Sequence, residues 1–253
     1  MTGPETPALW AAALAVTLLA GAVKGAIGFA MPLIMISLLT VFLDPRLALA
    51  GIILPVLASN GMQVLRMGLG PAGEAVRHHW RYLVVICLAI FGAAQLVPRM
   101  SPELFFLVLG VPVVALSVIQ LVGWRPRIPP ERRNAAEWGV GLASGLLGGL
   151  AGTWGPTTVL YLIALQTPKA RQIVVQGVIY GVGAVVLLLA HLRSGVLNAQ
   201  TVWFSAALLP VSMLGMWLGF RLQDRMDAER FRRATLAVLT LAGLNLIRRG
   251  LGL

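Results

Sequence analysis

The sequence has few charged residues, few acids and almost no cysteine. Charged residues make up 11% of the 253 residues, against about 25% in a soluble globular protein, so the chain cannot coat a water-exposed surface. The single cysteine, Cys87, excludes an internal disulfide and a cysteine-rich metal site, and we expect a small buried thiol. None of the nine acids lies deep in an apolar segment, which leaves no obvious carboxylate for a proton relay or a cation site.

The sequence also lacks the motifs of catalysis and cofactor binding. It has no Ser-His-Asp order and no metal-ligand spacing, and the His78-His79 pair stands in a basic loop, where an interfacial pair is the common case. The run "GLLGGLAG" (145–152) follows no predicted strand and lacks the Lys-Ser/Thr ending of a phosphate loop. We therefore predict no catalytic residue, no metal, no cofactor and no enzymatic activity.

Hydrophobic residues dominate instead, at 58% of the chain with a mean hydropathy of +0.86. They form apolar segments separated by short polar loops, which predicts an all-α integral membrane protein. Eight such segments can be delimited: 8–43, 47–65, 82–98, 103–122, 136–166, 170–190, 201–220 and 231–247. The net charge is +11, and because the bases lie in the loops we assign them to membrane orientation rather than to nucleic acid.

The first and fifth segments are each too long for one membrane crossing and too short for two, since a spanning helix needs about 20 residues. Both are interrupted by glycines and a proline, in "GAVKGAIGFAMP" (21–32) and "GGLAGTWGP" (148–156). Irregular backbone at membrane depth is tolerated only where protein or a water-filled cavity surrounds it. We expect Pro32 and Pro156 in the first turn of a second half-helix, whose N-terminal N–H groups would face an anion.

The two halves of the chain resemble each other. The glycines and proline of the first break recur in the second at an offset of 124 residues, as from Gly25 to Gly149. Further matches follow in order at nearly the same offset: Asp44-Pro45-Arg46 with Thr167-Pro168-Lys169, Trp80 with Trp203, and Gly92 with Gly215. An internal duplication follows. We predict a first transmembrane repeat over 1–123, a cytoplasmic linker over 124–137 and a second transmembrane repeat over 138–253.

The loop charges favour one of two topologies. If all eight segments cross, the loop Lys and Arg divide 10 against 9 between the two faces. If the first and fifth segments are re-entrant hairpins, 14 share one face and 5 the other, a clear positive-inside bias. Each repeat is then a broken helix hairpin plus three transmembrane helices, the repeats are inverted, and both termini lie outside. This is a known transporter plan, and eight spanning segments remain the alternative.

Polar residues in and after the breaks are the candidates for substrate binding. A charge inside a membrane segment, as at Lys24, is a functional-site hypothesis unless it snorkels to an interface. Threonines beside the second break can donate to an oxyanion or bond back to their own helix, and polar residues in the next segments can line a site or join helices. An anion fits this lining better than a cation does. The candidate substrate-binding residues are Lys24, Gly25, Gly28, Asn60, Gln63, Gly152, Thr153, Trp154, Thr157, Gln176 and Tyr180.

These motifs resemble those of the sulfite exporter TauE/SafE family of membrane transporters. The resemblance rests on "GAVKGAIGFAMPLI", "DPRLALAGIILPVLASNGMQ", "GLLGGLAGTWGPTTVLYL" and "LLPVSMLGMWLGFRLQDRMDAERFRR", and it extends over essentially the whole chain. It implies a multi-pass permease of the inner (plasma) membrane for sulfite, thiosulfate or an organosulfonate.

The expected function is therefore transport of a small anion through a central site between the two helix breaks. A passive anion channel with the same half-helices is the alternative. The expected partners are the anionic substrate and the lipid bilayer, with no nucleic acid. The sequence leaves open which anion is carried, in which direction, with which coupling ion, and whether the protein forms a homo-oligomer.

Overall fold

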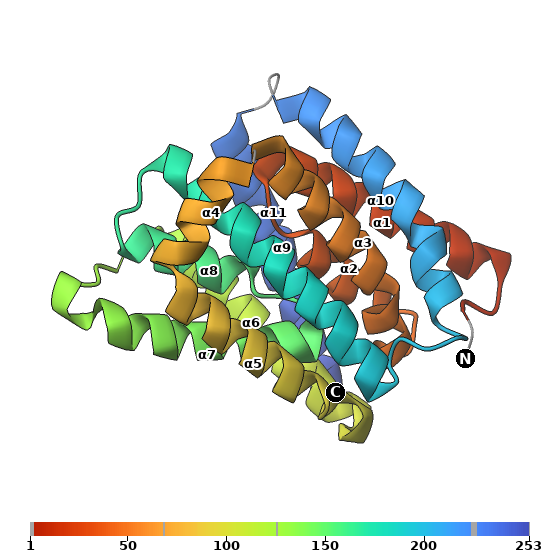
Figure 1. Cartoon of the computed structure of the whole chain (residues 1–253). Helices are drawn as coiled ribbons and strands as arrows, with labels where there is room; N and C mark the ends of the chain where they lie inside the picture. The colour runs from red at the N-terminus through yellow and green to blue at the C-terminus, as the bar shows by residue number, and fades with distance from the viewer. Residues whose placement is uncertain (1–2, 68, 125, 224–226, 253) are drawn as a thin grey trace.

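The computed structural model describes residues 3–67, 69–124, 126–223 and 227–252 (Figure 1). Within these ranges the chain forms eleven α-helices, two short 3-10 helices and no strand. Six of the described helices are long and apolar enough to cross a membrane: Pro7–Ile27, Pro45–Leu65, Trp80–Arg99, Pro102–Val122, Arg171–Ser194 and Val202–Leu222. The predicted all-α architecture with several membrane-crossing helices is confirmed.

Each of the two long segments folds as two helices, as their glycines and prolines predict. The first gives α1 (Pro7–Ile27) and α2 (Met31–Leu39), and the fifth gives α7 (Arg133–Ala151) and α8 (Gly155–Ala164). The remaining helices are α3 (Pro45–Met67), α4 (Leu69–His78), α5 (Trp80–Ala94), α6 (Pro102–Val122), α9 (Lys169–Ser194), α10 (Val202–Gln223) and α11 (Ala228–Gly250), with 3-10 turns at Val97–Arg99 and Pro130–Arg132.

Two helical stretches fall where the sequence predicted loop or linker. Helix α4 lies in the basic loop after the second segment, and α7 begins at Arg133, inside the range 124–137 predicted as linker. The 3-10 turn Pro130–Arg132 leads directly into α7, and the ion pair of Arg133 with Glu137 one turn later stabilises its start. The polar composition of this first turn therefore marks a helix end rather than a linker.

The two breaks share one backbone design. Helix α1 ends at Gly28 (φ 83°), whose N–H donates to the Lys24 carbonyl at 2.7 Å, and α7 ends at Gly152 (φ 67°), whose N–H donates to the Gly148 carbonyl at 2.7 Å. This left-handed cap favours glycine because other residues are strained there. Pro32 and Pro156 stand in the first turns of α2 and α8, as predicted.

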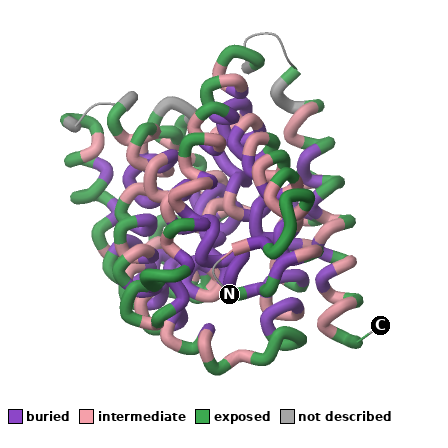
Figure 2. Tube along the Cα trace, turned by 90° about the vertical axis from the view of Figure 1, so that its right-hand side faces the viewer, coloured by how far each residue is buried: buried purple, intermediate pink, exposed green. Residues whose placement is uncertain are grey.

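Helices of one half of the chain pack against helices of the other half. Figure 1 shows α1 beside α10 and α3 beside α9, and α5 contacts α7 while α6 contacts α11. Buried residues concentrate along the inner sides of these helices (Figure 2). Because helices from the two halves pack against each other, both halves share one hydrophobic core. The breaks of both halves are held within that shared interior.

Glycines carry the closest of these contacts. On α1, Gly21 and Gly25 face Gly215 and Gly219 of α10, and a Cβ added to Gly25 would lie 2.9 Å from the Gly219 Cα. Small residues let helix backbones approach in a membrane, where lipid offers no hydrophobic drive between helices. Gly25, predicted to bind substrate, is thus used for helix packing.

The α5–α7 contact can be tested by filling it. A Cβ at Gly145 would lie 2.7 Å from the Ile86 carbonyl oxygen, whereas one at Gly139 in the same helix meets nothing within 4 Å. We expect Gly145→Leu to lower the free energy of unfolding by about 3 kcal/mol and Gly139→Leu to leave it nearly unchanged, measured by thermal unfolding in detergent. Equal effects of the two variants would contradict a close α5–α7 contact.

Candidate functional site

The two helix breaks meet at one cavity. The first break contributes Phe29, Ala30, Pro32 and Leu33 to its lining, and the second contributes Gly152, Thr153, Trp154, Gly155 and Pro156. Three polar side chains complete the lining: Lys24 of α1, Asn60 of α3 and Tyr180 of α9. The cavity measures about 20 Å³, room for roughly one water molecule. The first turns of α2 and α8 therefore open onto one shared, small space.

Lys24 supplies the charge of this cavity. The residue is 2% exposed, so its ammonium does not snorkel to a surface. It donates to the Ser59 hydroxyl at 2.9 Å and to the Asn60 side-chain oxygen. An ammonium has three N–H donors, and these two acceptors are both neutral.

Hydrogen bonds continue from Asn60 to the second break. The Asn60 amide nitrogen donates to the Tyr180 carbonyl at 3.2 Å, and the Tyr180 hydroxyl donates to the Gly155 carbonyl at 3.1 Å. Lys24 on α1 is thereby connected through α3 and α9 to the first turn of α8. The polar side of the cavity is one connected network rather than a set of separate groups.

Trp154 forms a contrasting wall. It is 3% exposed, and its ring lies where a Cβ on either Gly148 or Gly183 would come within 3.0 Å. At the offset of 124 residues, Gly148 corresponds to Lys24 and Trp154 to Ala30. The first half therefore contributes a cation to the lining, and the second half contributes an indole ring from a non-equivalent position.

The cavity brings together part of the predicted set. Of the candidates, the residues that line it are Lys24, Asn60, Gly152, Thr153, Trp154 and Tyr180. Gly28 caps α1 without lining the cavity, and Gln63 and Gln176 are half-buried outside it. Thr157 accepts a hydrogen bond from Ser144 at 2.7 Å and donates to the Trp154 carbonyl at 2.9 Å, so its hydroxyl is used within the protein.

Ser59 contacts Lys24 at 2.9 Å but was not among the candidate substrate-binding residues. The Lys24 chain is long enough to reach Ser59 and Asn60 together, whereas Gln63 lies outside the lining. A buried lysine needs several acceptors, so the Ser-Asn pair itself was the available signal.

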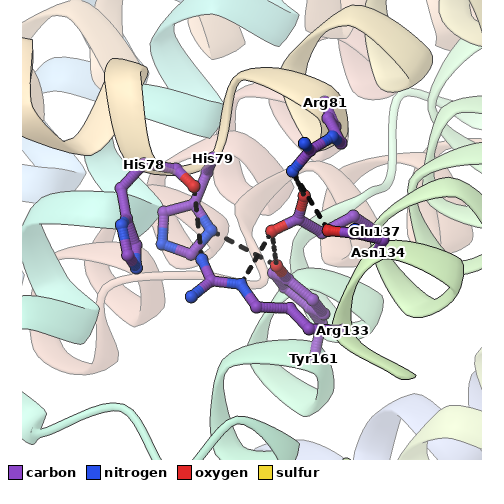
Figure 3. A network of polar contacts seen from close by, with 7 residues as sticks. All are labelled: His78, His79, Arg81, Arg133, Asn134, Glu137 and Tyr161. Atoms are coloured by element: carbon purple, nitrogen blue, oxygen red, sulfur yellow. Dashed lines mark hydrogen bonds and ion pairs between the residues drawn. The ribbon is translucent and has the colours of Figure 1, made fainter. Parts of the chain in front are cut away.

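A second polar cluster lies at the N-terminal end of α7 (Figure 3). Glu137 is 1% exposed, accepts hydrogen bonds from Arg133 at 3.0 Å and Tyr161 at 3.2 Å, and has Arg81 at 3.9 Å. Arg133 also donates to the His78 carbonyl at 3.2 Å. Glu137 stands at the start of its apolar segment rather than deep within it, and the arginine charge beside it makes its burial tolerable.

His79 is a neutral member of this cluster. Its Nδ1 lies 3.3 Å from the Tyr161 hydroxyl, and burial, with the charge of Arg133 adding to it, lowers the pKa of His79 to about 4. Across 3–67, 69–124, 126–223 and 227–252, no group of three or more His, Cys, Asp or Glu residues is placed to hold a metal ion. The cluster is thus a charge-compensated anchor between α5, α7 and α8.

Hydroxyl groups lead from the neighbourhood of this cluster toward the second break. Tyr161 stacks on Tyr82 with ring centroids 4.7 Å apart, and the Tyr82 hydroxyl lies 2.7 Å from that of Ser144. Ser144 bonds to Thr157, which bonds to the Trp154 carbonyl. These contacts fix the backbone of the second break to α5 and α7.

Comparison with known proteins identifies one family. The family model described as Sulfite exporter TauE/SafE matches residues 13–246, which include both breaks and every residue that lines the cavity. No curated protein and no solved structure matches the chain.

The anchoring role of Glu137 can be tested by its effect on stability. Replacing Glu137 by Gln leaves Arg133 without its buried partner, and we expect the free energy of unfolding to fall by about 3 kcal/mol. The exposed Glu131 in the adjacent 3-10 turn provides a matched control, since Glu131→Gln should change stability by less than about 0.5 kcal/mol. Thermal unfolding in detergent compares the two, and an unaffected Glu137→Gln would contradict the anchor.

Proposed function

The chain belongs to the sulfite exporter TauE/SafE family of membrane transporters, and we propose that it carries sulfite, thiosulfate or an organosulfonate across the inner membrane. The observation that carries this proposal is the convergence of two helix N-termini and one buried ammonium on a single cavity. The substrate-binding group consists of Lys24 and Asn60 with the backbone of the two breaks.

The electrostatics of the cavity favour an anion. Helix N-termini carry partial positive charge that attracts anions, and those of α2 and α8 both open onto the space that Lys24 lines. Among the described residues that line it, Lys24 is the only charged one, and no carboxylate is present to attract a cation. Trp154, Phe29 and Pro156 offer apolar surface that suits the organic part of a sulfonate.

The size of the cavity supports a carrier over a channel. A space of about 20 Å³ has room for roughly one water molecule, so an anion would need the cavity to widen in order to bind and pass. Alternating access meets this requirement, since it moves the opening from one face to the other around a fixed site. A carrier saturates and exchanges labelled for unlabelled substrate, whereas a channel conducts in proportion to the gradient.

We further propose that the two repeats are inverted and that α1–α2 and α7–α8 are re-entrant hairpins. In this topology α1 does not cross although it is long and apolar enough to do so, and the crossing helices are α3, α5, α6, α9, α10 and α11. Supporting contacts place the two ends of the α7–α8 pair beside the basic loops: Arg133 at the start of α7 bonds to His78, and Ala164 at the end of α8 accepts from the Ile128 N–H at 2.9 Å. Helices α3 and α9 are the equivalent helices of the two proposed repeats, and they run in opposite directions side by side (Figure 1). A two-fold axis in the membrane plane that relates inverted repeats requires this antiparallel arrangement.

The ends of the α1–α2 pair have their own contacts at another end of the bundle. Trp10 packs edge-to-face on Phe204 near the start of α1, and Arg249 of α11 donates to the Thr40 carbonyl at the end of α2. Arg46, which follows α2, donates to the Met100 carbonyl at 3.1 Å. The loops at this end of the bundle contain few Lys and Arg residues. Under the positive-inside rule, this supports an outward orientation of the ends of α1 and α2.

Removing the Lys24 charge tests the transport function. In proteoliposomes we expect wild-type protein to transport sulfite, thiosulfate or sulfoacetate, and Lys24→Met to transport that anion on the order of a hundredfold more slowly, because a charge-assisted contact is lost. Expression yield and thermal unfolding check that the variant still inserts and folds. A folded Lys24→Met protein with normal anion flux would contradict this assignment of the site.

The hairpin topology makes a separate prediction. In a Cys87→Ala background, single cysteines added at either terminus should react with an impermeant thiol reagent from outside intact cells. Each repeat would cross the membrane an odd number of times, so the whole chain would cross an even number of times and both termini would lie on the outer face. A cysteine in the linker 124–137 should react only after permeabilisation. A C-terminal cysteine protected until permeabilisation would contradict the hairpins.

A further inference from the structure

We propose that Lys24 also carries the proton that accompanies the anion. In this inference, which rests on the proposed transport function, the ammonium binds together with the anion and loses its proton when the anion leaves, so that both cross the membrane in the same direction. Lys24 would then determine the coupling ion as well as the charge of the substrate.

The first argument is the cost of the empty site. Lys24 is 2% exposed, and its two acceptors, Ser59 and Asn60, are neutral. A buried ammonium without a counter-charge is strongly destabilised, and the usual relief is loss of the proton. A bound anion supplies the missing counter-charge. Anion binding and protonation of Lys24 therefore stabilise each other, and by linkage each must promote the other.

The second argument is the hydrogen-bond geometry. A neutral amine keeps two N–H groups, enough to serve both the Ser59 hydroxyl and the Asn60 oxygen. The third position on Nζ can then hold a lone pair when the cavity is empty and an N–H when an anion is present. Losing the proton thus breaks neither of these contacts, and the cavity can cycle between two fully bonded states.

The third argument is the absence of competing charges nearby. Among the described residues lining the cavity, only Tyr180 can also titrate, and its hydroxyl already donates to Gly155. Three charged groups on helices packed around Lys24 have partners of their own: Arg221 of α10 lies over the Trp217 ring at 3.8 Å, Arg249 of α11 bonds to Thr40, and Arg46 of α3 bonds to Met100. On α9, Arg171 is exposed and the buried His191 lies 3.1 Å from the Ser194 hydroxyl, near the opposite end.

Glu137 is the other buried ionisable group to consider, and it fits a proton carrier less well. Its carboxylate is paired with Arg133 at 3.0 Å and lies 3.9 Å from Arg81, so its charge already has partners within the protein. It also does not line the cavity. Among the described residues that line the cavity, Lys24 is the one that combines burial, an uncompensated charge and access to the substrate space.

The proton balance is simple. On binding, Nζ takes one proton from the water at the open face, and on release it returns that proton to the water at the other face. The empty carrier then crosses back with a neutral amine. A monoanion would cross with no net charge, and a dianion would carry one net negative charge.

Proteoliposomes enclosing a pH-sensitive dye can test this inference with thiosulfate, sulfoacetate and sulfite as probes. We expect about one proton to enter with each anion that the wild-type protein carries, and an inward proton gradient to drive accumulation that an uncoupler abolishes. Thiosulfate and sulfoacetate stay fully ionised near neutral pH, so a proton that accompanies them belongs to the protein. The wild-type ratio tests the inference without any variant.

Lys24→Arg separates the charge from the proton, because a guanidinium is not deprotonated in proteins. We expect this variant to exchange labelled thiosulfate or sulfoacetate at a reduced rate and to move no protons with either. Lys169→Arg, at the chain's other lysine, is the matched control and should behave as wild type. Flux of none of the three anions would contradict the proposed function itself. Flux without accompanying protons in the wild type, or proton movement retained in Lys24→Arg, would overturn the coupling alone.

Discussion

The buried ammonium of Lys24 is the constraint on which the centre of the molecule depends. It must be hydrogen-bonded inside a membrane protein, and its acceptors Ser59 and Asn60 connect α1 to α3. Asn60 and Tyr180 then extend the connection through α9 to α8. A single charge thus determines how four elements are arranged around the cavity, because each polar group in the network leaves the next one requiring a partner.

Glycine contacts hold the two breaks in position around that charge. The long arms α1 and α7 pack against α10 and α5 through backbones that no side chain separates, as at Gly25 and Gly145. Helices in such contact tolerate little sliding without clashes, so each arm and its partner are expected to move as a unit. A change in access to the cavity would then come from relative movement of these pairs rather than from bending at Gly28 or Gly152.

The breaks were the most predictable part of the structure, because glycine and proline act through local backbone geometry. The two breaks and the restarts at Pro32 and Pro156 follow from sequence alone, whereas Gly28 and Gly152, expected at the substrate, prove to be helix caps. Side-chain roles were less predictable since they depend on which helix lies opposite. Gly25 could not be told from a substrate contact without α10, and the burial of Glu137 could not be foreseen without Arg81.

The difference between the two halves explains why one charge suffices. The two breaks correspond at an offset of 124 residues, and a lysine at Gly148 would place a second ammonium beside a cavity of about 20 Å³. Two like charges that close in a low-dielectric space repel strongly, and only one could stay protonated. Trp154 occupies the space over Gly148 instead. The second half therefore contributes shape and an apolar wall, while the first half contributes the charge, and the cavity matches a small anion with a single cation.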